Sequence, residues 1–235
     1  MTRFFLNRVD HFIIMSKSVQ GDLLALFPDA HFDLIPHPLF ELFGQPLPKK
    51  DARKSLGLKE KRIILYFGFI RPYKGVDILI QATKILKDKL DDFRVLVIGE
   101  CYENASDYQK LVMDASVEDV LNMNMDFVPN QKVAQYFSAA DLVVLPYKSA
   151  TQSGVVPIAF HFNKPVVVTN VGGLPEIVPN GKAGYVVEGT AEKISEAVIR
   201  FFNENKTAAF SHYIQSYKQR FSWDSFTEKL EMLVQ

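Results

Sequence analysis

The chain has 235 residues, and its 27 Lys and Arg residues balance its 27 Asp and Glu residues. A net charge of zero gives no long-range field of one sign, which disfavours a role in binding nucleic acid or an anionic membrane. Hydrophobic residues make up 48% of the chain and charged residues 23%, a composition that excludes a disordered protein. The length predicts one large domain, or one domain with pieces of another.

The single cysteine and the first residues of the chain bear on its compartment. Cys101 has no cysteine partner for a disulfide, which agrees with a reducing cytoplasm. Residues 1–10 carry charges where a secretory signal would be apolar, and no apolar run reaches the roughly 18–20 residues of a transmembrane helix. No spacing of His, Cys, Asp and Glu indicates a metal site. We expect a cytoplasmic protein without a transmembrane segment, and peripheral attachment to a membrane stays open.

Short apolar runs alternate along the chain with longer segments of helical periodicity. The predicted strands, in chain order, are His11–Met15, Asp33–Ile35, Arg62–Phe69, Arg94–Gly99, Met125–Val128, Leu142–Pro146, Pro165–Thr169 and Tyr185–Val187. The predicted helices are Ser18–Leu26, Gly75–Leu90, Gln131–Ala140, Val155–Phe162, Ala191–Phe202 and two more between Lys206 and Val234. This alternation is typical of βαβ units, so we expect an α/β fold with a Rossmann-like, doubly wound parallel sheet.

The predicted elements divide the chain into unequal parts. Residues 1–36 hold too few elements to close a doubly wound sheet, and we interpret them as a remnant of another domain. Residues 37–50, bracketed by prolines and without periodicity, are the predicted linker, in which His37 is expected to face a cleft between the parts. Residues 51–202 hold six strands and form the complete domain. Residues 203–235 are predicted to form helices.

The loop after the third predicted strand carries two cations. Ligands of open parallel sheets bind beyond the carboxyl ends of the strands, so this loop, residues 67–75, is a candidate site. Arg71 offers a planar fork and Lys74 a compact charge, which suits phosphate, and Gly68 permits a close approach of the backbone. The alternative is that both cations are solvated loop charges.

Three further loops follow strands in the same way. Residues 147–154 feed a predicted helix and can offer backbone N–H groups to an anion, although Ser153 fits equally well as a helix cap. Residues 170–176 contain paired glycines, and Glu176 complements the start of a short helix, so a purely structural role explains this loop almost as well. Residues 99–102, together with residues 128–130, are placed at the far end of the cleft.

Several familiar motifs are absent from the sequence. No G-x-G-x-x-G follows a strand, and neither G-x-x-x-x-G-K-[ST] nor G-x-S-x-G occurs. Dinucleotide binding, P-loop chemistry and serine-hydrolase chemistry therefore lack their usual elements.

Taken together, the loops resemble those of the nucleotide-sugar-binding C-terminal domain of GT-B retaining glycosyltransferases of group 1, also called family 4. Residues 66–80 resemble that family's G-R and K-G-hydrophobic-D segment. Residues 127–146 are similar to its base-side loop and its A-D-hydrophobic-P strand, and residues 164–176 to its P-V-V and G-G-x-x-E element. Phe221-Ser222-Trp223 matches a common opening of the family's final helix.

The resemblance implies a hexosyltransferase-like enzyme and assigns roles to particular residues. Arg71 and Lys74 are expected to bind the donor diphosphate as the catalytic groups. The donor and phosphate contacts are expected from Gly68, Gln152, Ser153, Gly154, Gly172, Gly173 and Glu176, and the base-side contacts from Val128 and Pro129. The implied donor is a nucleotide-diphosphate sugar, with no cofactor and no metal. The resemblance also implies that residues 1–36 are the C-terminal remnant of an acceptor-binding, Rossmann-like N-terminal domain and that the last helix returns toward that domain. The implied partners are a glycan or lipid acceptor and an absent N-terminal domain or complementary subunit, without nucleic acid.

The sequence departs from the family pattern at two places. Phe69 occupies the position of the family's arginine, two residues before Arg71. The family's E-x7-E element has no counterpart, because no glutamate lies between Lys148 and Pro165. Three interpretations stay open: the donor-binding part of a retaining glycosyltransferase, a non-catalytic nucleotide-sugar-binding or scaffold module, and another GT-B chemistry such as epimerisation.

Overall fold

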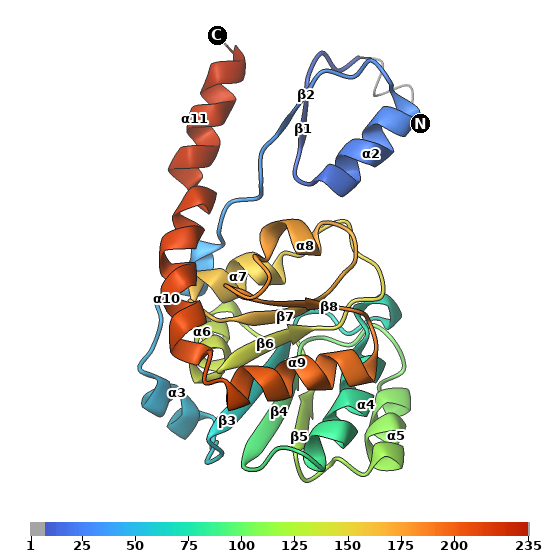
Figure 1. The fold of residues 1–235 in the computed structure, drawn as a ribbon, viewed down its shortest axis with the longest axis vertical. Coiled ribbons are helices and arrows are strands. Elements are labelled where there is room, and N and C mark those ends of the chain that lie inside the picture. Colours follow the sequence, from blue (N-terminus) through green and yellow to red (C-terminus); the bar gives the residue numbers. More distant parts are fainter. Residues whose placement is uncertain (1–7, 235) are drawn as a thin grey trace.

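A six-stranded parallel sheet forms the centre of the structure, a computed structural model that describes residues 8–234. Its strands are β3 (Arg62–Phe67), β4 (Phe93–Ile98), β5 (Leu121–Asn124), β6 (Leu142–Leu145), β7 (Val166–Thr169) and β8 (Gly184–Val187). The strand order is β5-β4-β3-β6-β7-β8, and the direction of winding reverses between β3 and β6 (Figure 1). The predicted α/β fold with a Rossmann-like parallel sheet is confirmed.

Helices cover the sheet and are named here with their bounds. They are α3 (Lys49–Ser55), α4 (Val76–Lys87), α5 (Ala105–Ala115), α6 (Asn130–Ala139), α7 (Val155–His161), α8 (Leu174–Ile177) and α9 (Ala191–Asn203). Helix α4 packs beside α5 and α9, and α3 packs beside α6. Strands β6 and β7 are buried along their whole length. This burial explains why their sequences consist of Val and Leu, apart from the Thr that ends β7.

One strand lies four residues before its predicted position. The prediction placed a strand at Met125–Val128, whereas β5 spans Leu121–Asn124 and pairs with β4, so that prediction is wrong. Strand β5 is at the edge of the sheet, and asparagines alternate with its apolar residues, so it shows no continuous apolar run. Residues 125–128 instead form the loop that leads to α6.

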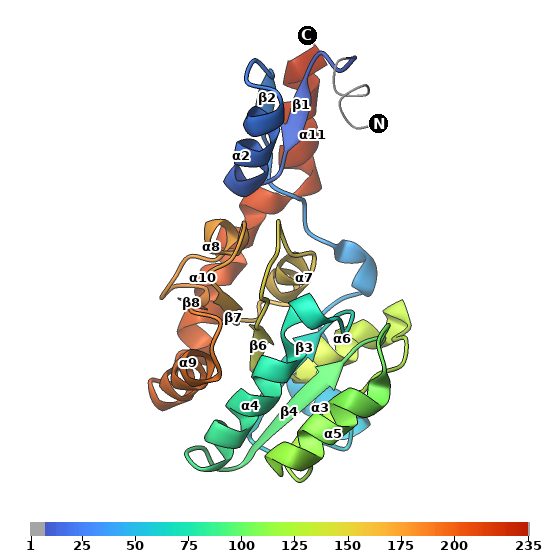
Figure 2. The ribbon, with the colours of Figure 1, turned by 90° about the vertical axis from the view of Figure 1, so that its right-hand side faces the viewer.

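The N-terminal part forms a small sheet of its own. Strands β1 (Phe12–Ile14) and β2 (Phe32–Leu34) pair in parallel, with α2 (Lys17–Leu26) between them in the chain. Figure 2 shows this part beyond the carboxyl-end side of the main sheet, on the far side of α7 and α8. The predicted linker that follows, residues 37–50, contains a 3-10 turn at Glu41–Phe43 and the start of α3, so part of it is regular structure.

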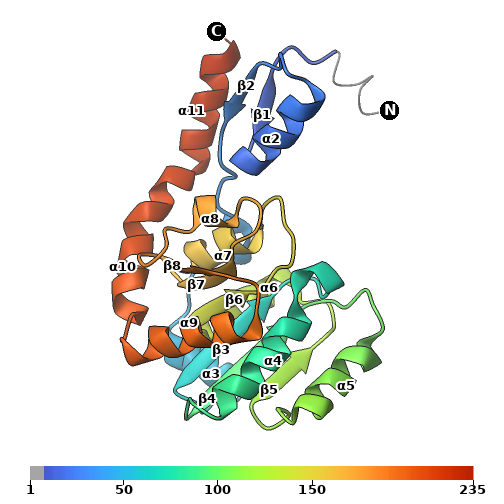
Figure 3. The ribbon, with the colours of Figure 1, turned by 45° about the vertical axis from the view of Figure 1, so that its right-hand side comes forward.

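The C-terminal helices extend back toward this N-terminal part. Helix α10 (Thr207–Tyr217) continues through a 3-10 turn (Lys218–Phe221) into α11 (Trp223–Val234) (Figure 3). Phe221 is buried, and its carbonyl accepts a hydrogen bond from the backbone N–H of Leu39 at 2.9 Å. The chain passes between the main sheet and the N-terminal side of the molecule twice, at residues 35–48 and at residues 218–222. This hydrogen bond joins the two segments.

A buried carboxylate at the start of β6 connects three elements. Asp141 is 5% exposed and accepts hydrogen bonds from the Ile63 backbone N–H at 2.7 Å and from the Arg53 guanidinium at 2.6 Å. Its other oxygen accepts a hydrogen bond from the Lys49 ammonium group. These bonds tie α3 and β3 to β6. The conspicuous Asp of the A-D-hydrophobic-P segment therefore has a structural role, at the end of the sheet opposite the carboxyl ends of the strands.

Candidate functional site

A cleft of about 390 Å³ lies beyond the carboxyl ends of β3, β4 and β5. It adjoins the point between β3 and β6 where the strand order reverses, which is where open α/β sheets bind ligands. Four predicted site residues, Gly68, Lys74, Val128 and Gly154, line this cleft. These residues come from the loops after β3 and β5 and from the turn before α7, and Gly99 and Glu100 line the cleft from the loop after β4.

Lys74 supplies the cleft with a positive charge. It ends a 3-10 turn (Pro72–Lys74), and its ammonium nitrogen lies 3.8 Å from the centre of the Tyr147 ring. Burial lowers the pKa of Lys74 to about 8, and no neighbouring charge contributes to that shift. None of the ion pairs within residues 8–234 includes Lys74. A half-buried cation without an ion-pair partner among the described residues is suited to an anionic ligand.

The backbone after Lys74 fixes this arrangement. Gly75 has φ +70°, and a Cβ atom there would lie 1.9 Å from the Pro146 carbonyl oxygen. Only glycine permits this close approach of the loop to the chain that follows β6. The approach holds Lys74 over Tyr147, which immediately follows Pro146.

Arg71 lies at the rim of the site and does not line the cleft. Its guanidinium carbon is 4.8 Å from the centre of the Tyr102 ring, and the Tyr102 hydroxyl donates a 2.9 Å hydrogen bond to Glu100. Phe69, at the position of the family's arginine, is 50% exposed and meets Tyr102 edge to face at 5.2 Å. The guanidinium group of Arg71 thus lies over the Tyr102 ring. Arg71 has no carboxylate partner among the ion pairs of the described residues.

Different residues of the loop after β6 face two different surfaces. Ser153 is buried, and its hydroxyl accepts a 3.2 Å hydrogen bond from the backbone N–H of Val155, the first residue of α7, although the N-cap residue of that helix is Gly154. Gln152 instead points to the N-terminal part, and its side-chain amide lies 3.5 Å from the Met15 sulfur. Of this loop, Gly154 faces the cleft.

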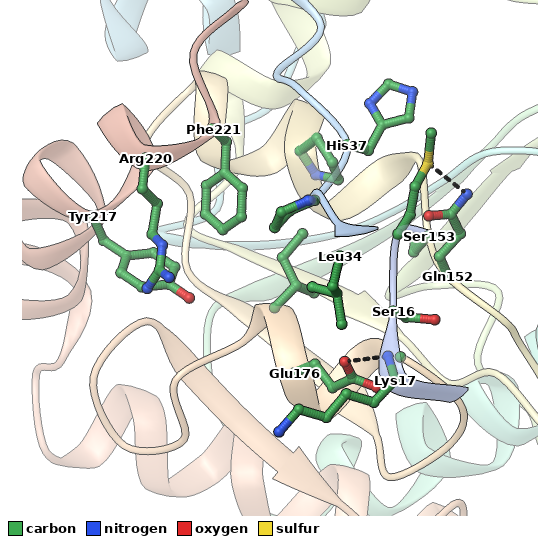
Figure 4. A pocket seen from close by; sticks show the side chains of 15 residues that line it. Ser16, Lys17, Leu34, His37, Gln152, Ser153, Glu176, Tyr217, Arg220 and Phe221 are labelled. Atoms are coloured by element: carbon green, nitrogen blue, oxygen red, sulfur yellow. Dashed lines mark hydrogen bonds between the residues drawn. The ribbon is translucent and has the colours of Figure 1, made fainter. Parts of the chain in front are cut away.

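A second cavity, of about 270 Å³, lies between the N-terminal part and the loops after β6 and β7 (Figure 4). Ser16, Lys17 and His37 line it from one side, so His37 faces a cavity between the two parts, as predicted. Gln152 and Glu176 line it from the other side.

The glycine pair after β7 packs closely against both the loop after β6 and the N-terminal part. Gly172 has φ +51°, and a Cβ atom there would lie 1.4 Å from the Ala150 carbonyl oxygen. A Cβ atom on Gly173 would lie 2.8 Å from the Cβ of Ser16. The carboxylate of Glu176 accepts hydrogen bonds from the backbone of the N-terminal part (Figure 4). Gly172, Gly173 and Glu176 were predicted to contact the donor, and in this structure they contact other parts of the protein.

Some residues of the cleft were not predicted from the sequence. Phe127 and Val133 line the cleft beside Val128, while Pro129 forms the N-cap of α6 between them. Phe127 is 65% exposed. An aromatic residue in the loop after a strand could have indicated a ligand contact, but the wrongly predicted strand Met125–Val128 included Phe127. Tyr147 is fully buried and was not predicted as the ring beneath Lys74, because nothing in the sequence shows that two loops more than 70 residues apart meet.

The residues that the structure describes form neither a metal-binding cluster nor a membrane-spanning helix. Within residues 8–234, no three His, Cys, Asp or Glu side chains are grouped so as to hold a metal ion. Among the helices of the same residues, none is long and apolar enough to cross a membrane.

A doubly wound parallel sheet with a glycine-lined cleft at its switch point defines an α/β domain of the Rossmann type. Residues 48–219 match the family described as glycosyl transferases group 1, and the chain belongs to this family. The resemblance to the GT-B C-terminal domain is thereby confirmed.

Named proteins agree with this assignment. The chain is 29% identical over 236 residues to a D-inositol 3-phosphate glycosyltransferase of Mycobacteroides abscessus, covering 95% of this chain and 51% of that protein. The chain thus spans about half the length of this relative. The solved structure of Anabaena Alr3699/HepE in complex with UDP superimposes with a TM-score of 0.86 at 20% identity, over 97% of this chain and 64% of that one. The C-terminal domain of a Francisella tularensis glycosyl transferase group 1 family protein, LpcC, gives a TM-score of 0.69 at 20% identity, over 78% of this chain and 97% of that one.

Proposed function

We propose that the chain is the donor-binding part of a retaining glycosyltransferase that transfers a hexosyl group from a nucleotide-diphosphate sugar to an acceptor. Lys74 is the observation that carries this proposal, because it places a half-buried positive charge, without an ion-pair partner among the described residues, in the cleft at the switch point of the sheet. The relative from Mycobacteroides abscessus is named as a glycosyltransferase, and HepE was solved with UDP, which supports a nucleotide-sugar donor here. Retention of configuration is proposed from the family resemblance.

The charges of the cleft suit the leaving group of this reaction. Transfer breaks the bond between the anomeric carbon of the sugar and the diphosphate oxygen, and negative charge develops on the departing nucleoside diphosphate. Lys74 is positioned to stabilise that charge, since its low-dielectric surroundings strengthen the attraction. Arg71 is proposed to contact the diphosphate from the rim, and Gly68 to admit it close to the backbone. The proposed chemistry uses no metal or cofactor.

The two ends of the cleft are proposed to hold different parts of the donor. Phe127, Val128 and Val133 form an apolar end that suits the flat face of a nucleobase. The sugar is proposed to lie toward Gly172 and Gly173, near the second cavity. We further propose that a glycan or lipid acceptor binds on that side, together with a further Rossmann-like domain on the same or a second polypeptide.

Family membership favours this enzyme function over a non-catalytic scaffold. The absence of the E-x7-E glutamates is the feature that suggested a scaffold. The part of the chain where that element is missing contains α7, which is buried at every position. A scaffold would have no need of a desolvated lysine without a carboxylate partner.

Calorimetry with UDP, GDP and their hexose conjugates tests the proposal. The chain is expected to bind at least one of the two nucleoside diphosphates, and the double variant Arg71→Ala/Lys74→Ala to bind it more weakly. If the wild-type chain binds neither nucleotide, or if the double variant binds as well as the wild type, the proposal is wrong.

Nucleotide affinity is also expected to depend on pH in a direction that Lys74 sets. Its pKa of about 8 means that the ammonium group loses its proton as the pH rises through 8, and only the protonated form attracts a diphosphate. Affinity is therefore expected to change little near pH 7 and to fall about fivefold between pH 8 and 9, as the protonated fraction drops from about one half to about one tenth. Calorimetry across this range measures the profile, and Lys74→Met should remove its steep part. A wild-type profile that stays flat from pH 7 to 9 would contradict the assignment to Lys74.

A further inference from the structure

The first turn of α2 takes its hydrogen-bond acceptors from two different parts of the chain. The N–H groups of a first helical turn have no acceptor within the helix. The hydroxyl of Ser16, the N-cap residue, accepts the Val19 N–H at 3.3 Å. The Lys17 N–H and the Ser18 N–H donate instead to Glu176, to Oε2 at 2.8 Å and to Oε1 at 3.3 Å. Each oxygen of this one carboxylate thus satisfies a separate backbone donor.

Glu176 belongs to α8 in the donor-binding part, 159 residues beyond Lys17. Its negative charge therefore lies at the positive end of a helix that belongs to the N-terminal part. Hydrogen bonds from backbone N–H groups to a carboxylate are stronger than those to a neutral oxygen. A glutamate at this position suits α2 better than a glutamine, because the amide offers only one acceptor oxygen and no charge.

The residues around this contact belong to the loops proposed to bind the donor. The Thr151 carbonyl oxygen accepts the Gly173 N–H at 3.0 Å and the Ser16 hydroxyl at 3.4 Å. Gly173 has no room for a side chain, because its Cα hydrogens face Ser16. The turn between β1 and α2 is thus seated on both loops at once, with Glu176 as its charged contact (Figure 4).

We propose that Glu176 is a positioning residue that holds the β1–α2 turn against the loops after β6 and β7. In this role it is not a ligand of the donor, and it keeps the N-terminal part closed over the second cavity. The inference rests on the proposed function only for the identity of the ligand that these loops bind. The closed arrangement itself follows from the contacts between Glu176 and the α2 backbone.

Amide hydrogen exchange, followed by NMR on the whole chain, tests the contact directly. In Glu176→Ala, the amides of Lys17 and Ser18 are expected to exchange at least about tenfold faster, and Glu176→Gln to give a smaller increase. The matched control is Glu118→Ala, which replaces an exposed glutamate before β5 and should leave α2 unchanged. Exchange in Glu176→Ala equal to that of the wild type would overturn the proposal.

A second measurement separates positioning from donor binding. Glu176→Ala is expected to bind a nucleoside diphosphate within about twofold of the wild type, because its contacts are with protein. Lys74→Ala is expected to bind more weakly and to leave the exchange of α2 unchanged. A loss of affinity in Glu176→Ala as large as that in Lys74→Ala would make Glu176 a donor ligand and overturn the positioning role. If the wild type binds no nucleotide, the proposed function fails, and the exchange result alone decides for or against the positioning role.

Discussion

Lys74→Ala is expected to weaken the binding of a nucleoside diphosphate by about 10- to 100-fold, which corresponds to the loss of a charge-assisted hydrogen bond in a half-buried site. The cause is specific to the position of this lysine. Its ammonium group lies over Tyr147 inside the cleft, and no carboxylate of the described residues forms an ion pair with it. Arg71→Ala should have a smaller effect, because Arg71 lies at the exposed rim.

The control for this prediction lies on the helix that follows Lys74. Lys87 is near the far end of α4, where it forms an exposed ion pair with Asp119 at 2.7 Å. Lys87→Ala removes the same charge from the chain and should leave nucleotide affinity within about twofold. Calorimetry on both variants measures the difference. Equal affinities of Lys74→Ala and Lys87→Ala would show that the cleft does not bind the diphosphate through Lys74.

Asp141→Ala is expected to lower the free energy of unfolding by about 3–5 kcal/mol, the range found when one partner of a buried ion pair is removed. Asp141 is the shared acceptor of the Ile63 N–H, Arg53 and Lys49. Its loss leaves a buried backbone donor without an acceptor and leaves the partly buried Arg53 guanidinium without its carboxylate partner. Nearby, burial lowers the pKa of Lys164 to about 8, so this region already disfavours positive charge.

Denaturant unfolding of a matched pair of variants checks this value. Asp119→Ala removes an exposed ion pair and should cost less than about 1 kcal/mol. A loss in Asp141→Ala as small as that in Asp119→Ala would mean that the Asp141 contacts do not hold α3 and β3 to β6.

The fold was predictable because most strands of the main sheet are buried on both faces. Strands such as β6 and β7 contain only apolar residues or a single Thr, so their positions follow from composition alone. Strand β5 was misplaced because an edge strand needs apolar residues on one face only. Its asparagines resemble a loop, and the more apolar Met125–Val128 segment beside it resembled the strand.

The cleft was predictable where its residues follow strands, and not where distant segments meet. Gly68 and Lys74 lie in the loop after β3, where a parallel sheet directs its ligands. The contacts of Glu176 depend on how α2 sits against α8, and a separation of 159 residues leaves no local signal. A glutamate in the first turn of α8 was expected to complement that helix, but its hydrogen bonds go to the start of α2.

We expect the cleft beyond the carboxyl ends of β3, β4 and β5 to hold the diphosphate of the donor. A crystal structure of the chain with a bound nucleoside diphosphate tests it most directly. The expected result has phosphate oxygens within hydrogen-bond distance of the Lys74 ammonium group and the base against Phe127 and Val128. A diphosphate bound instead in the second cavity, beside Lys17 and Arg220, with the cleft empty, would contradict the claim.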